Sequence, residues 1–188
     1  VRQLIDTDQT PERRQLVVMN ASGVVAQHTG GACVPEAGYR VGEDWVVSGN
    51  VLTSVDVLDE MAKRARRDGP LSSRLLEVLE AGAVAGGDLR GIQSAALRLS
   101  GLSGAPADTD WVELIVADHP DPVAELRRLL TLDQDYRTVG KAMEVAAEGG
   151  DAQSLYEAVG IATPEVAFWK AIGLALSGSL DEAALLWD

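Results

Sequence analysis

Two short runs of uninterrupted apolar residues constrain the fold of this chain most strongly. Residues 16–19 (LVVM) and 114–117 (LIVA) are β-prone, and neither run alternates apolar with polar side chains. A strand without a polar face is typical of a sheet that is covered on both faces. Helical patterns lie between the strand-like segments, so helices can supply that cover. We therefore expect an α+β protein in which sheets are layered with helices.

The order of the expected elements follows from apolar periodicity and from turn residues. Residues 15–19 and 24–28 are predicted to form a hairpin, because the turn-prone residues 20–23 (NASG) lie between them. Residues 29–43 are glycine-rich and are expected to be a loop. Further strands are predicted at residues 45–47, 94–99 and 111–117, with helices at residues 53–67 and 71–84 and from Asp121 onward. Thr53 and Asp56 fit a capping box, and Asp121 followed by Pro122 fits a helix start.

The pattern changes to helices alone after about residue 133. Short helices are predicted at residues 136–147, 152–159, 165–176 and 181–187, separated by breaks such as Gly149-Gly150 and Thr163-Pro164. Phe168-Trp169, Gly173 and residues 181–183 (DEA) loosely resemble a tetratricopeptide-type helical hairpin, although their spacing is shorter than that repeat requires. We expect two domains, a layered domain over residues 1–132 and a helical extension over residues 133–188.

Charge and composition exclude several classes of partner. The net charge is −13, with 29 acidic and 16 basic residues, which disfavours nucleic-acid binding. The basic run at residues 63–67 (KRARR) is expected to lie at a helix C-terminus, where cations are favoured. No apolar run is long enough to span a membrane, and no metal or cofactor motif is present. The single cysteine, Cys33, suits a reducing compartment, so we expect a cytoplasmic protein.

The stretch 85–97 (AGGDLRGIQSAAL) places more polar groups before an apolar strand than a turn requires. Loops at strand ends carry function disproportionately, so Asp88, Arg90, Gln93 and Ser94 are candidate substrate-binding residues. Asp88 and Arg90 are two residues apart and can form a charge-assisted hydrogen bond that makes the loop rigid. The alternative is that these side chains only cap and pair with one another.

Three other places contain groups capable of chemistry. Asp118 and His119 follow a strand, and a carboxylate can orient an imidazole for acid–base catalysis, although Asp121 can equally cap the helix while His119 fills a slot. Asn50 also ends a strand and can donate a hydrogen bond to a substrate oxygen, or simply adopt a turn conformation. His28 and Cys33 are possible catalytic groups, but no nucleophile signature surrounds them.

Several of these motifs together resemble one family. They are Arg14-Gln15, His28-Thr29-Gly30, Cys33, Gly49-Asn50, residues 86–96 (GGDLRGIQSAA), residues 118–122 (DHPDP) and Glu125-Leu126. In this order the sequence is similar to the domain of unknown function 1028 family, most distinctively over residues 86–96. The resemblance implies an N-terminal-nucleophile (Ntn) hydrolase-like sandwich with α/β/β/α layers, in which loop 86–94 faces the active cleft.

The sequence departs from the family pattern in two respects. Where the family has an arginine and an aspartate before the histidine motif, this chain has Ile115 and Ala117, which weakens any acid–base network there. The family also has a stretch upstream of the first motif, so we expect the first strands and the N-terminal nucleophile to lie outside these residues. Val1 has no nucleophilic side chain.

Two functions follow as expectations. The first is an amide-bond hydrolase of the N-terminal-nucleophile type, completed by residues outside this sequence, with a small-molecule or peptide amide as its substrate. The second is a non-catalytic binding or assembly module on the same fold. Unpaired sheet edges favour a homo-oligomer or pairing with an upstream polypeptide. Phe168, Trp169 and Trp187 offer a further contact surface.

Overall fold

The computed structural model describes residues 1–100, 111–160 and 163–186, which form two compact units, Val1–Arg127 and Arg128–Asp188. The elements, in chain order, are α1 (Arg2–Asp6), the 3-10 helix Pro11–Arg13, β1 (Gln15–Met19), β2 (Val25–Thr29), β3 (Gly38–Val41), β4 (Val46–Gly49), α2 (Asp56–Ala65), α3 (Leu71–Val84), β5 (Ala95–Leu99), β6 (Val112–Val116), α4 (Pro122–Ala147), α5 (Gln153–Ala158), α6 (Pro164–Leu176) and α7 (Leu180–Ala184).

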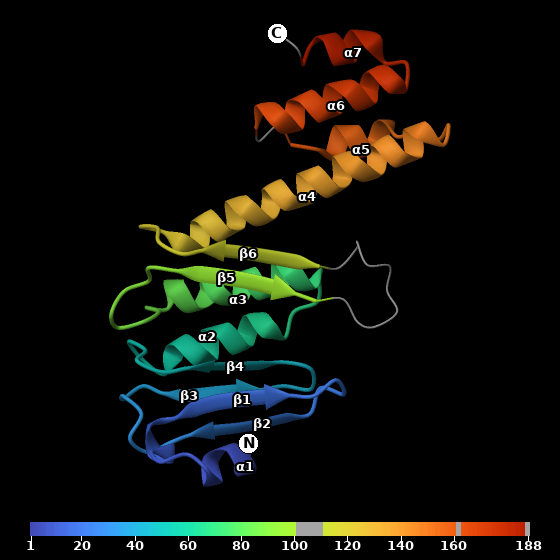
Figure 1. Ribbon diagram of the computed structural model, residues 1–188. Helices are drawn as coiled ribbons and strands as arrows, with labels where there is room; N and C mark the ends of the chain where they lie inside the picture. The colour runs from blue at the N-terminus through green and yellow to red at the C-terminus, as the bar shows by residue number, and fades with distance from the viewer. Residues whose placement is uncertain (101–110, 161–162, 187–188) are drawn as a thin grey trace. The chain divides into compact units, whose positions relative to one another are not determined.

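The described strands form three antiparallel hairpins, β1–β2, β3–β4 and β5–β6 (Figure 1). Small antiparallel sheets combined with several helices confirm the predicted α+β class. The first hairpin pairs Val17 with Gln27, and its turn is closed by Asn20, whose Oδ1 accepts hydrogen bonds from the backbone N–H groups of Ser22 and Val24. Asparagine favours such a turn because its side chain can bond to the backbone that follows it. The hairpin predicted from residues 15–28 is thus present.

Strand β3 corrects one prediction. Residues 29–43 were expected to be a loop, but Gly38–Val41 pairs with β4 in the register Gly38 to Gly49 and Arg40 to Val47. The Arg40 guanidinium is also held by Asp59 of α2, with Nε 2.7 Å from Oδ1. A four-residue strand has too short a pattern to be distinguished from a loop by periodicity. Its pairing with β4 is what defines it.

Helices α2 and α3 form the main apolar layer of the first unit. Val57 and Leu58 of α2 and Leu76 of α3 are almost completely buried, at 2 %, 1 % and 0 % exposed. Helix α2 packs against β3 and β4, and α3 packs against β5. Val47 of β4 accordingly joins a buried cluster with residues of both helices. Leu97 of β5 is likewise buried.

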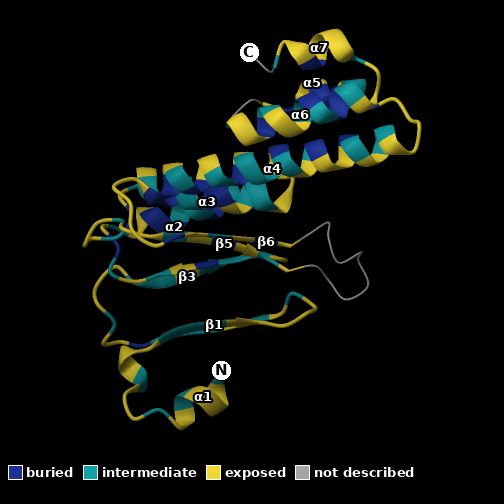
Figure 2. Cartoon of the chain, turned by 45° about the horizontal axis from the view of Figure 1, so that its top comes forward, coloured by how far each residue is buried: buried dark blue, intermediate teal, exposed yellow. Residues whose placement is uncertain are grey.

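The apolar strands are not covered on both faces in the described residues, contrary to the expectation. Burial along β6 alternates: Val112 and Val116 are buried, whereas Ile115 is 65 % exposed. Figure 2 shows exposed stretches of the β5–β6 hairpin in yellow. On β1, Val18 and Met19 are also exposed. Hydrophobic sequence alone does not report which face of a strand meets a helix, because both faces look the same in such a run.

The start of α2 differs from the predicted capping box. Val55 occupies the N-cap position and is itself exposed, and the Ser54 hydroxyl accepts a hydrogen bond from the Asp56 N–H at 3.2 Å. Thr53 lies against Gly86 instead, since a Cβ built on that glycine would come 2.2 Å from Thr53 Oγ1. The threonine is therefore occupied by a tertiary contact rather than by the helix end.

Helix α4 corrects the predicted separation of two helices. The sequence was expected to form one helix from Asp121 and another from residue 136, but Pro122–Ala147 is continuous over 26 residues. Neither glycine nor proline lies between residues 127 and 139, so nothing interrupts the helix there. Its predicted start is confirmed, since Asp121 Oδ1 accepts a hydrogen bond from the Ala124 N–H at 3.1 Å.

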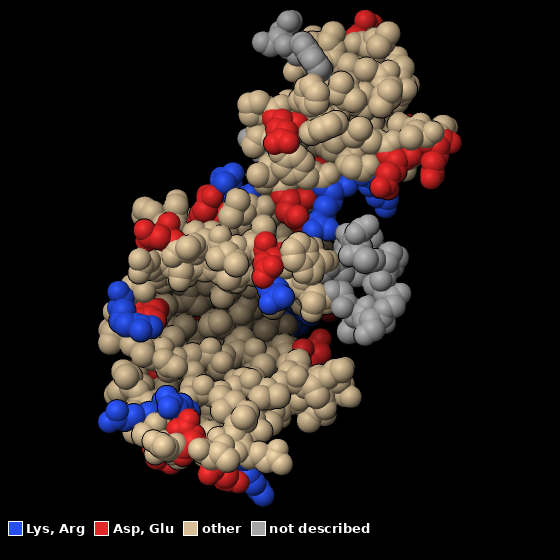
Figure 3. Space-filling model, in the orientation of Figure 1, with Lys and Arg blue, Asp and Glu red and all other residues tan. Residues whose placement is uncertain are grey.

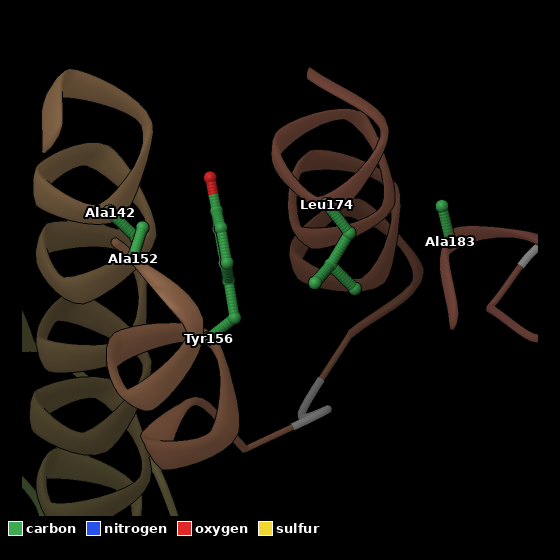
Figure 4. Close-up of a cluster of buried hydrophobic side chains, with 5 residues drawn as sticks. All are labelled: Ala142, Ala152, Tyr156, Leu174 and Ala183. Carbon is green, nitrogen blue, oxygen red and sulfur yellow. The ribbon is translucent and has the colours of Figure 1, made fainter. Parts of the chain in front are cut away.

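The second unit has a core of small residues around one tyrosine. Tyr156 is 1 % exposed, and its side chain points between the helices that carry Ala142 and Leu174 (Figure 4). Gly173 allows this approach, because a Cβ there would lie 2.1 Å from Tyr156 Oη. The small residue on α6 is thus what admits the ring.

Candidate functional site

Loop 86–94 leaves α3 through two glycines in left-handed conformations. Gly86 has φ = 121° and Gly87 has φ = 61°, and a Cβ on Gly87 would lie 2.9 Å from Ile92 Cδ1. Residues with a side chain rarely adopt such φ values. These glycines therefore turn the chain sharply and let the loop fold back on itself.

The segment after β4 anchors this loop. The Leu89 N–H donates to the Val51 carbonyl oxygen at 2.8 Å, and the Thr53 N–H donates to the Gly87 carbonyl oxygen at 3.1 Å. Val51 has φ = 57°, which is costly for a β-branched residue. The two backbone hydrogen bonds stabilise Val51 in this unfavourable conformation. They also fix the position of the loop relative to β4.

Asp88 and Arg90 form a two-point ion pair on the loop. Arg90 Nε lies 2.9 Å from Asp88 Oδ1 and Nη2 lies 2.7 Å from Oδ2, while the Arg90 backbone N–H donates to Oδ1 at 2.8 Å. The guanidinium, followed by the backbone N–H, lowers the pKa of Asp88 from 3.8 to about 2. The same contact raises the pKa of Arg90. The predicted pairing of these residues is present, and it holds an otherwise exposed arginine in one orientation.

A hollow of about 500 Å³ lies beside this ion pair. It is lined by Asp88, Arg90, Gly91, Ile92, Gln93 and Ser94. Four of the predicted substrate-binding residues therefore border one recess. The side chain of Arg90 is 73 % exposed, so its outer N–H groups remain open to solvent. A guanidinium, an amide and a hydroxyl around one recess can bind a ligand that presents oxygen acceptors.

Gln93 links the loop to the segment after β6. Its side-chain Nε2 donates to Asp118 Oδ1 at 3.0 Å, and its backbone carbonyl oxygen accepts a hydrogen bond from the His119 N–H at 3.1 Å. The His119 ring lies over the helix start, with Nδ1 accepting a hydrogen bond from the Asp121 N–H at 3.0 Å. Among the described contacts, the Asp118 carboxylate thus binds Gln93 rather than the imidazole. The two candidate catalytic residues are neighbours of the loop, but they do not form a carboxylate–imidazole pair.

Asn50 has a different neighbour. Its Nδ2 donates to Gln15 Oε1 at 3.2 Å, and the Gln15 amide in turn donates to the carbonyl oxygens of Gly38 and Gly49 at 3.0 and 2.9 Å. One side chain of β1 therefore connects to both strands of the next hairpin. Asn50 precedes the segment that anchors loop 86–94, but its side chain is directed to this cluster.

The two remaining candidates, His28 and Cys33, contact backbone carbonyl oxygens of the segment before β1. A ring nitrogen of His28 lies 2.9 Å from the Pro11 carbonyl oxygen, and Cys33 Sγ lies 3.4 Å from the Arg14 carbonyl oxygen. In the basic run, Lys63 pairs with Glu60, and Arg66 lies over the Trp45 ring. In residues 1–100, 111–160 and 163–186, no cluster of His, Cys, Asp or Glu could hold a metal. Over the same part of the chain, each helix is too short or too polar to cross a membrane.

Three residues of this region were not predicted to hold the site: Gln15, which was only part of the Arg14-Gln15 family motif, Val51, and Thr53, which was predicted to cap a helix. Their partners lie far along the chain, as in the 35 residues between Gln15 and Asn50. A glutamine at the start of a β-strand has no local pattern that predicts such contacts. Val51 follows the turn-prone Gly49-Asn50, which was the only local signal near it.

Comparison with known protein families identifies the family of this chain. A model described as a family of unknown function, DUF1028, matches residues 1–126. The chain belongs to the DUF1028 family. Loop 86–94, Asn50 and Asp118-His119 all lie inside the matched region. No curated protein matches the sequence.

Among solved structures, that of a second DUF1028 protein is similar to this chain. It is the crystal structure of a DUF1028 protein from Silicibacter pomeroyi, with 30 % sequence identity and a TM-score of 0.60. The match covers 69 % of this chain and 54 % of that protein, so this chain spans about half of its relative's length. The family resemblance based on the motifs is confirmed, and neither comparison assigns an activity.

Proposed function

We propose that loop 86–94 of this DUF1028 chain binds a small ligand with amide or carboxylate oxygens. The observation that carries the proposal is the two-point Asp88–Arg90 pair at the edge of a polar hollow. An exposed arginine normally loses side-chain entropy when it binds a ligand. Here Asp88 already restrains the guanidinium, so less entropy is lost on binding. The outer N–H groups can then donate to a ligand oxygen.

Within an Ntn-type sandwich of α/β/β/α layers, which the family resemblance implies, this ligand is the amide substrate of a hydrolase. The loop would hold the substrate, and a nucleophile outside these residues would attack the carbonyl carbon. The support for this step is the polar character of the hollow and its position next to His119. No described residue is assigned as the nucleophile.

A specific observation favours a non-catalytic binding module as the second candidate. The Asp118 carboxylate binds Gln93, and His119 Nδ1 accepts from a backbone N–H. Both groups of the predicted acid–base pair are thus engaged in holding the loop and the helix start. In this case ligand binding occurs without turnover.

Substitution of Asp88 tests the proposal. We expect Asp88→Asn to weaken binding of primary amides and N-acyl amino acids on the order of tenfold, because the guanidinium is no longer restrained. Amide chemical-shift changes detect the binding, and the melting temperature should change little. An exposed ion pair contributes about 1 kcal/mol or less to stability, so unfolding is not the cause of the loss. Hydrolysis assays on the same ligands distinguish the enzyme from the binding module.

The chain provides a matched control for this experiment. Asp8 also binds an arginine, with Arg14 Nε at 2.8 Å, and also accepts from the backbone N–H two residues on, that of Thr10 at 2.7 Å. We expect Asp8→Asn to leave ligand binding unchanged. A large fall in melting temperature for Asp88→Asn together with normal binding would show that the pair is purely structural.

The helical unit Arg128–Asp188 is proposed to serve in assembly, as tetratricopeptide-like hairpins do. Phe168 and Trp169 of α6 are 42 % and 40 % exposed, and their rings meet edge to face at 5.1 Å. Trp187, the third aromatic of the predicted contact surface, lies outside the described residues. If this surface joins two copies, Trp169→Ser shifts the sedimentation of the chain toward the monomer, and unchanged sedimentation contradicts the role.

A further inference from the structure

A second hollow, of about 540 Å³, lies in the unit Val1–Arg127, apart from loop 86–94. Residues of β4 and β5 bound it on two sides, and residues of α2 and α3 form its floor. In Figure 3 it is the sunken tan surface in the region between β5 and β4 of Figure 1. A recess with a strand on each side and helices beneath has the layout of a sheet from which a central part is missing.

The floor of the recess is mostly apolar, and Arg74 of α3 is a charged residue on it. Met61 of α2 and Leu75 and Val78 of α3 line it, and Leu75 is 36 % exposed. The side chains of Val47 and Leu97 are 6 % and 3 % exposed. Both strands therefore place one apolar residue toward the helices. A chain lying between them would place its alternate residues on the same floor, because side chains alternate between the faces of a sheet.

The two strand edges that face the recess have backbone groups available. Among the described residues, β4 pairs with β3 alone and β5 with β6 alone. In the β3–β4 hairpin, the Gly42 N–H donates to the Trp45 carbonyl oxygen at 2.9 Å. Bonded and non-bonded pairs alternate along an antiparallel ladder, so Val46 and Ser48 direct their backbone N–H and C=O groups away from β3. Both residues line the recess.

We infer that this recess binds an extended segment that pairs with β4 and β5 and places apolar side chains on the α2–α3 floor. A row of backbone donors and acceptors is satisfied by another strand, and a small ligand would leave most of them unpaired. In a second copy the described strands are already paired within hairpins, so none of these strands has both edges free to pair with β4 and β5. The segment has apolar residues at every second position.

The comparison with the Silicibacter pomeroyi protein indicates where such a segment exists. This chain spans 54 % of that protein, so nearly half of the relative's sequence has no counterpart in the alignment. The occupant of the recess is an extended segment of that unaligned part. The inference does not depend on the ligand proposed for loop 86–94.

Peptide binding tests the inference. The probes are overlapping synthetic peptides that cover the unaligned part of the Silicibacter pomeroyi protein, and fluorescence anisotropy measures their binding to the full 188-residue chain. We expect at least one peptide with alternating apolar residues to bind. Methylation of its alternate backbone nitrogens should abolish binding if strand pairing holds it, since methylation removes the N–H donors.

Two proline variants form a matched pair. Ser48→Pro removes a backbone N–H that faces the recess, and edge positions accept proline. Tyr39→Pro removes the N–H of its cross-strand partner in β3, which faces the other way. We expect Ser48→Pro to weaken peptide binding on the order of tenfold, the effect of one lost hydrogen bond, and Tyr39→Pro to leave it unchanged.

A third variant keeps the test valid if proline disturbs the hairpin. Leu75→Glu places a charge on the floor at a half-exposed position and should abolish peptide binding while circular dichroism stays unchanged. Asp88→Asn, which tests the loop, should not affect the peptide. The inference is overturned if no peptide binds, or if N-methylation and Leu75→Glu leave binding intact. A dimer that Ser48→Pro dissociates would assign the edge to a second copy instead and would equally overturn it.

Discussion

Asp88 shows how one carboxylate can organise a loop. It accepts two side-chain bonds and one backbone bond from the same residue, Arg90, which lies only two positions away. The charge of Asp88 therefore stabilises the local backbone turn as well as the ion pair. Protonation of this carboxylate removes both contributions at once.

The pH dependence of stability follows from this pair. The pKa of Asp88 in the folded chain is about 2, below the ordinary value of 3.8. A lowered pKa means that the folded state favours the charged form, so this stabilisation is present above about pH 4 and is lost as the pH falls toward about pH 2. Thermal unfolding of the wild type and Asp88→Asn should differ slightly at neutral pH, and the difference should shrink through pH 2 and vanish below it. A difference that persists at low pH would contradict this.

At the scale of elements, single side chains and turns join the hairpins. The Gln15 amide of β1 bridges the carbonyl oxygens of Gly38 and Gly49, which start β3 and end β4. Loop 86–94 is joined to the residues after β4 by backbone bonds. The position of the candidate site thus depends on contacts between elements and not on a single element.

Replacing Gln15 by glutamate tests the bridge between hairpins. The change keeps the shape but replaces the Nε2 donor with an oxygen that faces the carbonyl oxygens of Gly38 and Gly49. We expect the free energy of unfolding to fall by about 2–3 kcal/mol, because two hydrogen bonds are lost and a partly buried charge is introduced. Chemical denaturation measures it. Gln3→Glu, at an exposed position of α1, is the control and should change stability by less than about 0.5 kcal/mol.

Two glycines of loop 86–94 allow the cost of a strained backbone conformation to be distinguished from the cost of a steric clash. Gly86 and Gly91 both have positive φ, at 121° and 95°, but a Cβ on Gly86 would meet Thr53 Oγ1 whereas Gly91 has open space around it. We expect Gly91→Ala to cost about 1 kcal/mol from backbone strain alone and Gly86→Ala to cost about 2–4 kcal/mol. Equal losses in denaturation experiments would show that the Thr53 contact is not important.

At the scale of the whole molecule, each of the two units has its own core. The core of Arg128–Asp188 includes Ala142, Ala152, Tyr156, Leu174 and Ala183, and that of Val1–Arg127 includes residues of α2, α3 and the strands. The second core accommodates the buried Tyr156 because Gly173 has no side chain. A change in that core should therefore act on one unit and leave the loop site intact.

Gly173→Ala tests this independence. The added Cβ would lie 2.1 Å from Tyr156 Oη, so the ring has to move, and we expect a loss of about 1–3 kcal/mol in the second unit. Hydrogen exchange should become faster in α5 and α6 and remain unchanged in α2, α3 and loop 86–94. Tyr156→Phe removes a buried hydroxyl that has no hydrogen-bond partner among the described atoms, and it should be neutral or stabilising. Faster exchange in both units would contradict their independence.

The sequence by itself determined the features that depend on neighbouring residues. The turn at Asn20, the start of α4 at Asp121 and the Asp88–Arg90 pair are each formed within four residues, so their chemistry is visible locally. The family was also recognisable, because its motifs follow in order along residues 14–126. These contacts form at little entropic cost, since the chain between the partners is short.

The tertiary structure decided which of these groups meet. In the folded chain Gln93 binds the Asp118 carboxylate, which was expected to pair with His119. Asn50 binds Gln15. Thr53 lies against Gly86 and does not cap α2. The tertiary structure also made a strand of residues 38–41, which the local pattern did not distinguish from a loop. Partners separated by tens of residues come together only when hairpins and helices pack, and that packing depends on the total burial of the chain and not on any local segment.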